Sequence, residues 1–464
     1  MIVIDKKLLK ILILALVIRI PLLFFPINSN ELETLKSAIE LYNSTETLLY
    51  QASKEVINRS VWPPLTYYHF FFLYIIGFGT YNFIVVKSIW LVFDLLCIIY
   101  IYKIGDFYFY SEEKRNLFVN FYVLCPFIFL YTAYRGIHEI MTLFFVLASV
   151  YYFLKDKRIL SYTIMGIGFM HSFFPIYLII PYFLYSINQE KEFKKFLLVI
   201  PITISIVFLS YLPYLILIPE EISQDFINIL TKSNYTINFA SIFLPDIMNE
   251  TLFTIDLHFL QMDISLYHIY VLIILLLLFF LFYFKYKVKT KKDLIRCITC
   301  FFLILPFLTR SFHFRIFIWV FPFFSLLLLD YEDRRKIQDI PLLKRNYIQI
   351  TTFMIINIFI AIISAIFYLE NPNELISMEI FLIIVLVYIV IWTIFILSYN
   401  LFYSLIFAME LIVFSIYYVL FYYTPFWEYR LEINLIFLII YSISFLFFVY
   451  IIFLKWSTSL KENI

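Results

Sequence analysis

Residues 62–79, "WPPLTYYHFFFLYIIGFG", decide how this chain is threaded through its surroundings. A proline has no backbone N–H and fixes φ, so Pro63 and Pro64 cannot lie inside a regular helix but fit its first turn. The stretch therefore predicts a helix that starts at the prolines, with Tyr67, Tyr68 and His69 on the turns that follow. Such a break is either a stop between two helices or a device that directs side chains into a cavity at a membrane surface.

The composition around this stretch is that of a membrane protein. Of the 464 residues, 63% are hydrophobic, 22% are aromatic and only 15% are charged, with a mean hydropathy of +0.92. Soluble domains carry about a quarter charged residues and about half apolar residues, so soluble packing is excluded. The formal net charge of +2 matters less than the placement of the positive residues.

Apolar runs of spanning length recur along the whole chain. Because a spanning helix needs about 20 apolar residues, the sequence predicts an all-α polytopic transmembrane bundle of about fourteen spans within a single domain, 1–464. The run at 8–27 begins among three lysines, Lys6, Lys7 and Lys10, and lacks a small-residue cleavage site, so it is expected to be a retained anchor helix. The expected spans are 8–27, 82–103, 117–134, 137–154, 159–172, 174–187, 196–216, 264–284, 295–309, 311–329, 347–368, 378–398, 402–423 and 434–454.

The basic residues set the expected orientation. With both termini in the cytoplasm, nearly every inner loop is rich in Lys and Arg, whereas the large outer loops 28–81 and 217–263 are poor in them. This holds only if 62–78 does not cross the membrane, because one more crossing would invert every later loop. The sequence therefore predicts a helix lying on or dipping into the outer leaflet, and a multi-pass protein of the cell membrane.

The cysteines do not indicate a redox or metal site. All four lie in apolar runs, including the Cys297 and Cys300 pair within "IRCITCFFL". Thiols in such a setting are expected to be packing residues.

The first outer loop offers a pair of carboxylates. Glu31 and Glu33 follow the first span, and apolar residues at helical spacing predict an amphipathic helix over 31–43 in the interface. The pair could simply favour the dipole of that helix. The alternative is a general base at the membrane surface, where a lipid-linked substrate would arrive.

Two further polar clusters fall at predicted outer ends of spans. Arg135, His138 and Glu139 lie together in "YTAYRGIHEIMTLFF", and His171 lies in "GFMHSFFPIYLIIPYF". Ionisable groups at that depth are costly unless they are paired or face water. Arg135 and Glu139 are four residues apart and could pair with each other, and His171 could be an ordinary core residue.

The last cluster is positive on the outer side. Arg310, His313 and Arg315 crowd the turn in "LTRSFHFRIFIWVFPFF", against the positive-inside trend. Arginines there suit a phosphate group, which their planar fork of donors binds well. The alternative is that they reach towards lipid headgroups.

Together these segments resemble the GT-C superfamily of integral-membrane glycosyltransferases, and most closely its dolichyl-phosphate-glucose-dependent glucosyltransferases. The resemblance is carried by Glu31-Leu32-Glu33, by "WPPLTYYH" at 62–69, by Asp94 before paired leucines, and by the blocks around Glu139 and 310–315. The family has Asp where this chain has Glu31 and Glu139, and Lys where it has His171.

The resemblance implies transfer of a sugar from a polyprenyl-phosphate donor to a lipid-linked or protein-linked acceptor at the outer face, with inversion. It implies that Glu31 and Glu33 act as the base. It also implies that the donor phosphate is bound by Arg310, His313, Arg315 and His171. It places Trp62, Tyr67, Tyr68, His69, Arg135, His138 and Glu139 along the groove for the acceptor or lipid. It requires no cofactor, leaves a divalent metal open without indicating one, and implies no nucleic acid as a partner.

Two other functions remain open from the sequence. A transporter or flippase of lipid-linked saccharides would need ionisable residues near the middle of the bilayer, and Asp94 and Glu410 are the main candidates. A non-catalytic protein that keeps the GT-C-like fold is made plausible by the three substitutions at Glu31, Glu139 and His171.

Overall fold

The structure is a computed structural model that describes part of the chain. The described residues are 5–24, 30–45, 64–77, 82–109, 111–129, 132–133, 136, 138–172, 174–187, 190–217, 254–257, 262–265, 276, 279–304, 318–319, 322–323 and 325–326.

Helices dominate the described residues, and one short hairpin accompanies them. The hairpin pairs β1 with β2 in antiparallel register, so that Thr254 lies opposite Ser265. In chain order the elements are α1 (Lys6–Leu23), α2 (Asn30–Thr45), α4 (Pro64–Ile76), α5 (Phe83–Tyr108), α6 (Glu112–Val123), α7 (Pro126–Phe129), α8 (Glu139–Leu154), α9 (Arg158–His171), η2 (Phe174–Leu178), α10 (Ile179–Ile187), α11 (Glu190–Phe196), α12 (Val199–Leu217), β1 (Thr254–Leu257), β2 (Met262–Ser265), the π-helical η3 (Leu281–Tyr286) and α16 (Lys291–Ile304).

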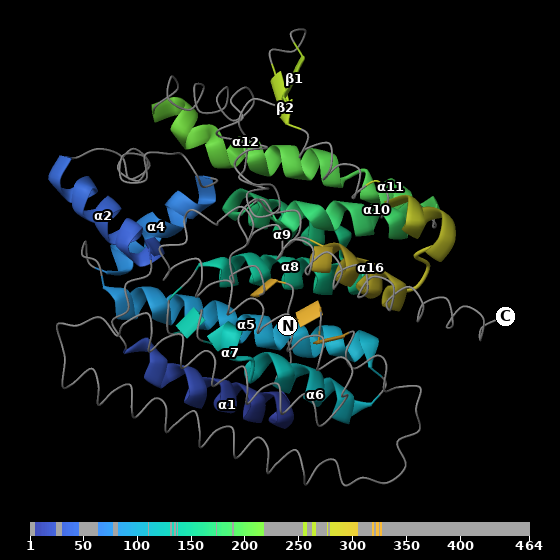
Figure 1. The fold of residues 1–464 in the computed structure, drawn as a ribbon, viewed down its shortest axis with the longest axis horizontal. Coiled ribbons are helices and arrows are strands. Elements are labelled where there is room, and N and C mark those ends of the chain that lie inside the picture. Colours follow the sequence, from blue (N-terminus) through green and yellow to red (C-terminus); the bar gives the residue numbers. More distant parts are fainter. Residues whose placement is uncertain are drawn as a thin grey trace, which may run out of the picture.

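The long helices lie side by side with nearly parallel axes. Contacts join α1 to α5, α5 to α8, α8 to α9 and α9 to α12, which gives the stacked order that Figure 1 shows. Among the described residues, Phe83–Tyr108 and Glu192–Leu217 are helical, long and apolar enough to cross a membrane, and Glu139–Leu154 and Phe174–Ile187 are shorter apolar helices. The described residues thus confirm the helical character, while the number of spans stays a prediction, because the expected spans from 347 onward lie outside the described residues.

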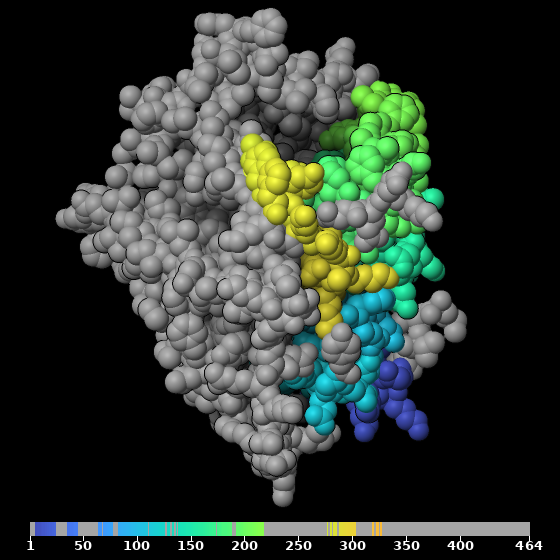
Figure 2. Space-filling model, turned by 90° about the vertical axis from the view of Figure 1, so that its right-hand side faces the viewer, coloured from blue at the N-terminus to red at the C-terminus, as the bar shows by residue number. Residues whose placement is uncertain are grey.

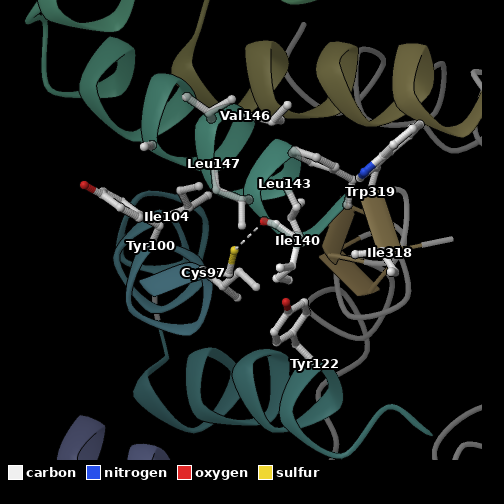
Figure 3. Packing of buried hydrophobic residues seen from close by; sticks show 14 of the residues in the cluster. Cys97, Tyr100, Ile104, Tyr122, Ile140, Leu143, Val146, Leu147, Ile318 and Trp319 are labelled. Carbon is white, nitrogen blue, oxygen red and sulfur yellow. Dashed lines mark hydrogen bonds between the residues drawn. The ribbon is translucent and has the colours of Figure 1, made fainter. Parts of the chain in front are cut away.

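The centre of this stack is an apolar core. Figure 3 shows its part between α5 and α8, where Cys97, Leu143, Leu147 and Trp319 converge. The Cys97 thiol lies 3.7 Å from the Ile140 carbonyl oxygen, to which it donates. All four cysteines are buried and unbridged, including Cys297 and Cys300, as expected of packing residues.

Two expected spans differ from the observed elements. The run at 117–134 is not one helix, because α6 ends at Val123 and a short separate helix, α7, begins at Pro126. A proline inside a helix removes a backbone donor and clashes with the preceding turn, which explains the break. The run at 264–284 begins with residues of strand β2 rather than with a helix. This hairpin was not predicted.

The first-loop helix and the prolyl helix form where the sequence predicted them. Helix α2 buries Leu35 and Ile39, which belong to the expected apolar stripe of 31–43. Helix α4 begins at Pro64, and its Tyr74 hydroxyl donates to the Asn43 side chain of α2 over 2.8 Å. With 13 residues, α4 is about 20 Å long, too short for a hydrocarbon core of about 30 Å. Residues 62, 63 and 78 lie outside the described residues, so the prediction that 62–78 does not cross the membrane stays a prediction.

Basic residues gather at one end of the stack. Three ion pairs there join separate elements: Lys7 with Glu112 (2.6 Å), Arg158 with Glu192 (2.6 Å) and Lys291 with Asp156 (2.7 Å). We call these six residues, with Lys195, the inner-end cluster. The structure contains no membrane, so the cytoplasmic side of this cluster stays a prediction of the positive-inside rule.

The contact between α8 and α9 gives a test of packing. A Cβ added to Gly168 would lie 2.6 Å from the Cβ of Phe145 and 3.0 Å from Pro175, both of which are rigidly placed. We expect Gly168→Ala to destabilise the protein by about 1–3 kcal/mol, the usual range for overpacking. Thermal unfolding in detergent would measure it.

Gly166→Ala is the matched control. Its Cβ would lie 2.6 Å from the Cδ1 atom of Ile206, the far end of a flexible side chain that can rotate away. Its cost should be clearly smaller. Equal unfolding temperatures for the two variants would contradict this account of the helix contact.

Asp5 begins α1 and gives a pH-dependent test. Partial burial acts to raise the pKa of the Asp5 carboxyl, but hydrogen bonds from the Leu8 and Lys7 backbone and from the Tyr102 hydroxyl outweigh it, so the pKa lies below its usual range. The stabilisation is therefore complete above the unfolded pKa of about 3.9 and is lost as the pH falls through the lower folded value. Asp5→Ala should cost about 1 kcal/mol at pH 7.

The measurement is the unfolding temperature of both proteins from pH 7 down to pH 3. The gap between wild type and Asp5→Ala should shrink as the pH falls. A gap that stays constant would show that the charge of Asp5 contributes nothing.

Candidate functional site

Three buried imidazoles meet at the end of the stack opposite the inner-end cluster. His69 comes from α4, His138 precedes α8 and His171 ends α9. The ring centroids of His69 and His171 are 5.8 Å apart, and those of His138 and His171 are 5.6 Å apart. The three residues are 8%, 5% and 2% exposed. We call them the histidine cluster.

The local sequence explains how this cluster forms. Gly136 has a φ of 64°, a backbone angle that residues with a side chain rarely adopt. The glycine therefore lets the chain turn sharply into α8. Glu139 then lies in the first turn of α8, where a carboxylate suits the helix dipole, and its Oε2 atom is 3.9 Å from Nδ1 of His138. The indole N–H of Trp319 donates to the Glu139 carbonyl oxygen over 3.2 Å.

Helix α4 is fastened to this end by its own hydroxyl groups. The buried Thr66 hydroxyl donates to the His171 carbonyl oxygen over 2.7 Å, and the Tyr68 hydroxyl donates to the Ser210 carbonyl oxygen of α12 over 3.2 Å. The ring nitrogens of His69 and His171 have no hydrogen-bond partner among the described residues. They are thus available to a polar group, but only at a nearly inaccessible position.

A second buried polar centre lies within the helices. Arg19 of α1 and Asp94 of α5 are both fully buried, and the Arg19 Nε–H donates to the Asp94 carboxylate. The Tyr122 hydroxyl donates to the other carboxylate oxygen over 2.9 Å, and the Thr132 hydroxyl lies 3.3 Å from the first. Arg19 also donates to the Val123 carbonyl oxygen over 3.1 Å. Buried charges of this kind are tolerated when they are paired and hydrogen-bonded.

The sequence reasoning singled out Asp94 but missed Arg19 as its partner. One signal was available, because an arginine in one apolar run and an aspartate in another are each costly alone and favourable as a pair. The sequence near Asp94 does not indicate that its partner is Arg19, which lies 75 positions earlier.

The structure brings together only part of the predicted site. It places His69, His138, Glu139 and His171 in one cluster and Tyr68 beside it. The side chains of Glu31, Glu33 and Tyr67 lie outside the described part, although their backbones belong to α2 and α4. Trp62, Arg135, Arg310, His313 and Arg315 also lie outside the described residues. The roles assigned to all of these residues stay predictions.

The described clusters do not form a metal centre. Among the residues that the structure covers, no group of three His, Cys, Asp or Glu side chains is placed to hold a metal ion. The histidine cluster offers hydrogen-bonding nitrogens, and the Arg19–Asp94 pair offers a carboxylate whose oxygens already accept from Arg19 and Tyr122.

The stretch from α4 through α12 decides the comparison with known proteins. Residues 59–242 match the family model of the GPI transamidase subunit PIG-U. The match covers less than half of the chain, but it includes "WPPLTYYH", the histidine cluster and Asp94. The chain has no match among the curated proteins compared with it.

This match corrects the function expected from the sequence. PIG-U is a multi-span membrane protein family related to GT-C-like enzymes. The match therefore supports the general resemblance to GT-C-like membrane proteins. The specific likeness to dolichyl-phosphate-glucose-dependent glucosyltransferases is not supported. The expectation of an enzyme that transfers sugars is wrong, because the matched family is a subunit of a transamidase, which exchanges amide bonds. The alternative of a non-catalytic GT-C-like membrane protein fits better.

Proposed function

We propose that this chain is a non-catalytic membrane subunit of a complex of the GPI transamidase type. The single observation that carries the proposal is the family match over 59–242, which includes the elements from α4 to α12. The proposal places the chain in a membrane with the inner-end cluster in the cytoplasm. Which membrane holds it, including the cell membrane expected from the sequence, stays a prediction.

The geometry of "WPPLTYYH" supports a scaffolding role. The hydroxyl groups of Thr66 and Tyr68 donate to carbonyl oxygens of α9 and α12, and His69 is buried against His171. Tyr68 and His69, two of the side chains assigned to the acceptor groove, are thus engaged in packing. The stretch that carried the resemblance to a glycosyltransferase acts here as a fastening between helices.

The Arg19–Asp94 pair also supports this role. A carboxylate that serves as a general base must accept a proton from a substrate. The Asp94 carboxylate instead accepts from Arg19 and Tyr122 at a fully buried position, which holds α1, α5 and α6 together. The proposal therefore assigns these polar groups to the stability of the subunit.

The test is co-purification of the tagged full-length chain from its native membrane in mild detergent. We expect a stable assembly with other membrane proteins, and amide exchange onto a GPI-type acceptor in the assembly but not in the isolated chain. The isolated chain should also leave a radiolabelled polyprenyl-phosphate sugar unchanged. Recovery of the chain as a lone monomer, or sugar transfer by it, would refute the proposal.

A variant sharpens this experiment. Tyr68→Phe removes only the hydroxyl that fastens α4 to α12, so it should weaken the assembly more than Tyr74→Phe, whose hydroxyl bonds within the first-loop pair α2 and α4. A larger loss of co-purifying proteins with Tyr68→Phe than with Tyr74→Phe would show that assembly depends on the position of α4 against α12.

A further inference from the structure

An apolar groove runs along one flank of the helix stack. Its cavity volume is about 410 Å³, and its lining comes from α10, from the end of α11 and the first turns of α12, and from Phe279. Figure 2 views the stack from the end where α11 lies and shows the yellow segment that includes η3 beside the green helices, in line with the contact between Phe183 and Phe279. The volume lies within the range of about 300–1,000 Å³ that is usual for small-molecule sites.

The back of the groove is aromatic. The ring centroids of Phe183 and Phe196 are 5.4 Å apart, and Phe183 stacks on Phe279 at 5.8 Å. Along the rim, Ile200 and Ile204 of α12 are 56% and 62% exposed. Among the described residues of the lining, Thr203 has the one polar side chain. A surface of this composition fits hydrocarbon and offers little to a polar ligand.

Both walls of the groove lead into lysines. Helix α11, Glu190–Phe196, carries three lysines and two glutamates, and residues 285–293, which follow Phe279, carry five lysines and one aspartate. The ion pairs Lys291–Asp156, Asp156–Arg158 and Arg158–Glu192 hold the two walls at the same end of the stack. The carboxylates of Asp156 and Glu192 are thus already paired with basic residues. Lys194, two residues before Phe196, is exposed.

We propose that this groove holds an acyl chain of an anionic phospholipid whose headgroup lies against the lysines at the inner end. An aliphatic chain gains free energy with every CH₂ group that it buries, and each lysine near an anionic headgroup adds electrostatic attraction. The proposal goes beyond assembly into a complex, because the groove and the lysines belong to this chain alone.

The test is photolabelling of the purified full-length chain in nanodiscs of phosphatidylcholine. A small fraction of the lipid carries a diazirine in its acyl chain, with either a phosphatidylserine or a phosphatidylcholine headgroup. Mass spectrometry of peptides should show labelling around Ile200–Ile204 that is several-fold stronger with phosphatidylserine. Equal labelling by both lipids would overturn the proposal.

Matched variants separate the groove from the general lipid surface. Ile204→Trp fills the groove and should reduce phosphatidylserine labelling several-fold, whereas Leu209→Trp, on the same helix outside the lining and 62% exposed, should not. Thr203→Val keeps the shape of the groove and should retain the label. Replacing Lys194 and Lys195 together by Glu should bring phosphatidylserine down to the level of phosphatidylcholine.

Two results would contradict the proposal outright. One is labelling that Ile204→Trp leaves unchanged in a variant with a normal size-exclusion profile. The other is loss of labelling when the chain is labelled within its purified complex, because a protein segment would then occupy the groove. Neither result bears on whether the complex forms, so this failure is distinguishable from failure of the proposed function.

Discussion

Asp94→Ala should leave little folded protein in the membrane. The change strands the Arg19 guanidinium at a fully buried position, and breaking a buried pair on one side costs about 3–5 kcal/mol. That is a large part of the stability of a typical folded domain, about 5–15 kcal/mol. The measurement is the monodisperse fraction after detergent extraction, with the unfolding temperature of whatever survives.

The double variant tests whether the pair is the cause. Arg19→Met combined with Asp94→Asn removes both charges and keeps an acceptor for the Tyr122 hydroxyl, so it should recover most of the loss of either single change. The control is Asp106→Ala, which removes an exposed partner of Arg115 and should cost about 1 kcal/mol or less.

The same variants distinguish a structural pair from an ionisable residue of a transport pathway. If Asp94 moved ions or protons, Asp94→Asn would keep the fold and lose only activity. A single variant that is as stable as the wild type, or a double variant that is no better than Asp94→Ala, would show that the pair does not hold the helices together.

Much of the helical pattern could be predicted from the sequence because it depends on local physics. The stripe of Leu35 and Ile39 has the period of a helix, and the start of α4 at Pro64 follows from the missing N–H of proline. The break at His171, before η2, was expected from the short runs on either side of it. Each of these features is encoded within a few residues.

The contacts between distant segments could not be predicted in the same way. Topology placed His69 and His171 on the same side, but their contact depends on how α4 packs against α9, and no periodicity encodes that. Pro126 itself indicated the break between α6 and α7. The apolar residues on both sides of it nevertheless led to the prediction of one continuous span.

The error in function has a different origin. The "WPPLTYYH" stretch carried the resemblance to a glycosyltransferase, and in the structure its Thr66 and Tyr68 hydroxyls donate to carbonyl oxygens of α9 and α12. A fold can be shared by proteins of unrelated function, so a motif that maintains the fold carries no information about the reaction. The side chains that would carry sugar transfer, Glu31 and Arg310, each had a structural alternative, a favourable helix dipole and contact with lipid headgroups, and both side chains lie outside the described residues.

Arg158→Ala should give the second large loss of stability, at the opposite end of the stack. The Arg158 side chain is 3% exposed and joins three groups: the Phe153 carbonyl oxygen, Asp156 and Glu192. Its guanidinium also lies 3.7 Å from the centroid of the Phe153 ring. Hydrogen bonds to charged groups contribute about 1.5–3 kcal/mol each, so the loss should be at least about 2 kcal/mol. Thermal unfolding in detergent measures it.

Arg158→Lys should recover little of that loss. An ammonium group is a compact point charge, whereas the planar guanidinium reaches the Phe153 carbonyl and Glu192 at once while it stacks on the Phe153 ring. Lys157→Ala, at the exposed neighbouring position, should change the stability by no more than about 0.5 kcal/mol. If Arg158→Lys matched the wild type, charge alone would hold α11 against the turn between α8 and α9, and the inner-end cluster would then be a general electrostatic surface. A loss confined to Arg158→Ala and Arg158→Lys instead identifies this guanidinium as the geometric link that fixes α11, and with it the lysine-bearing wall of the groove.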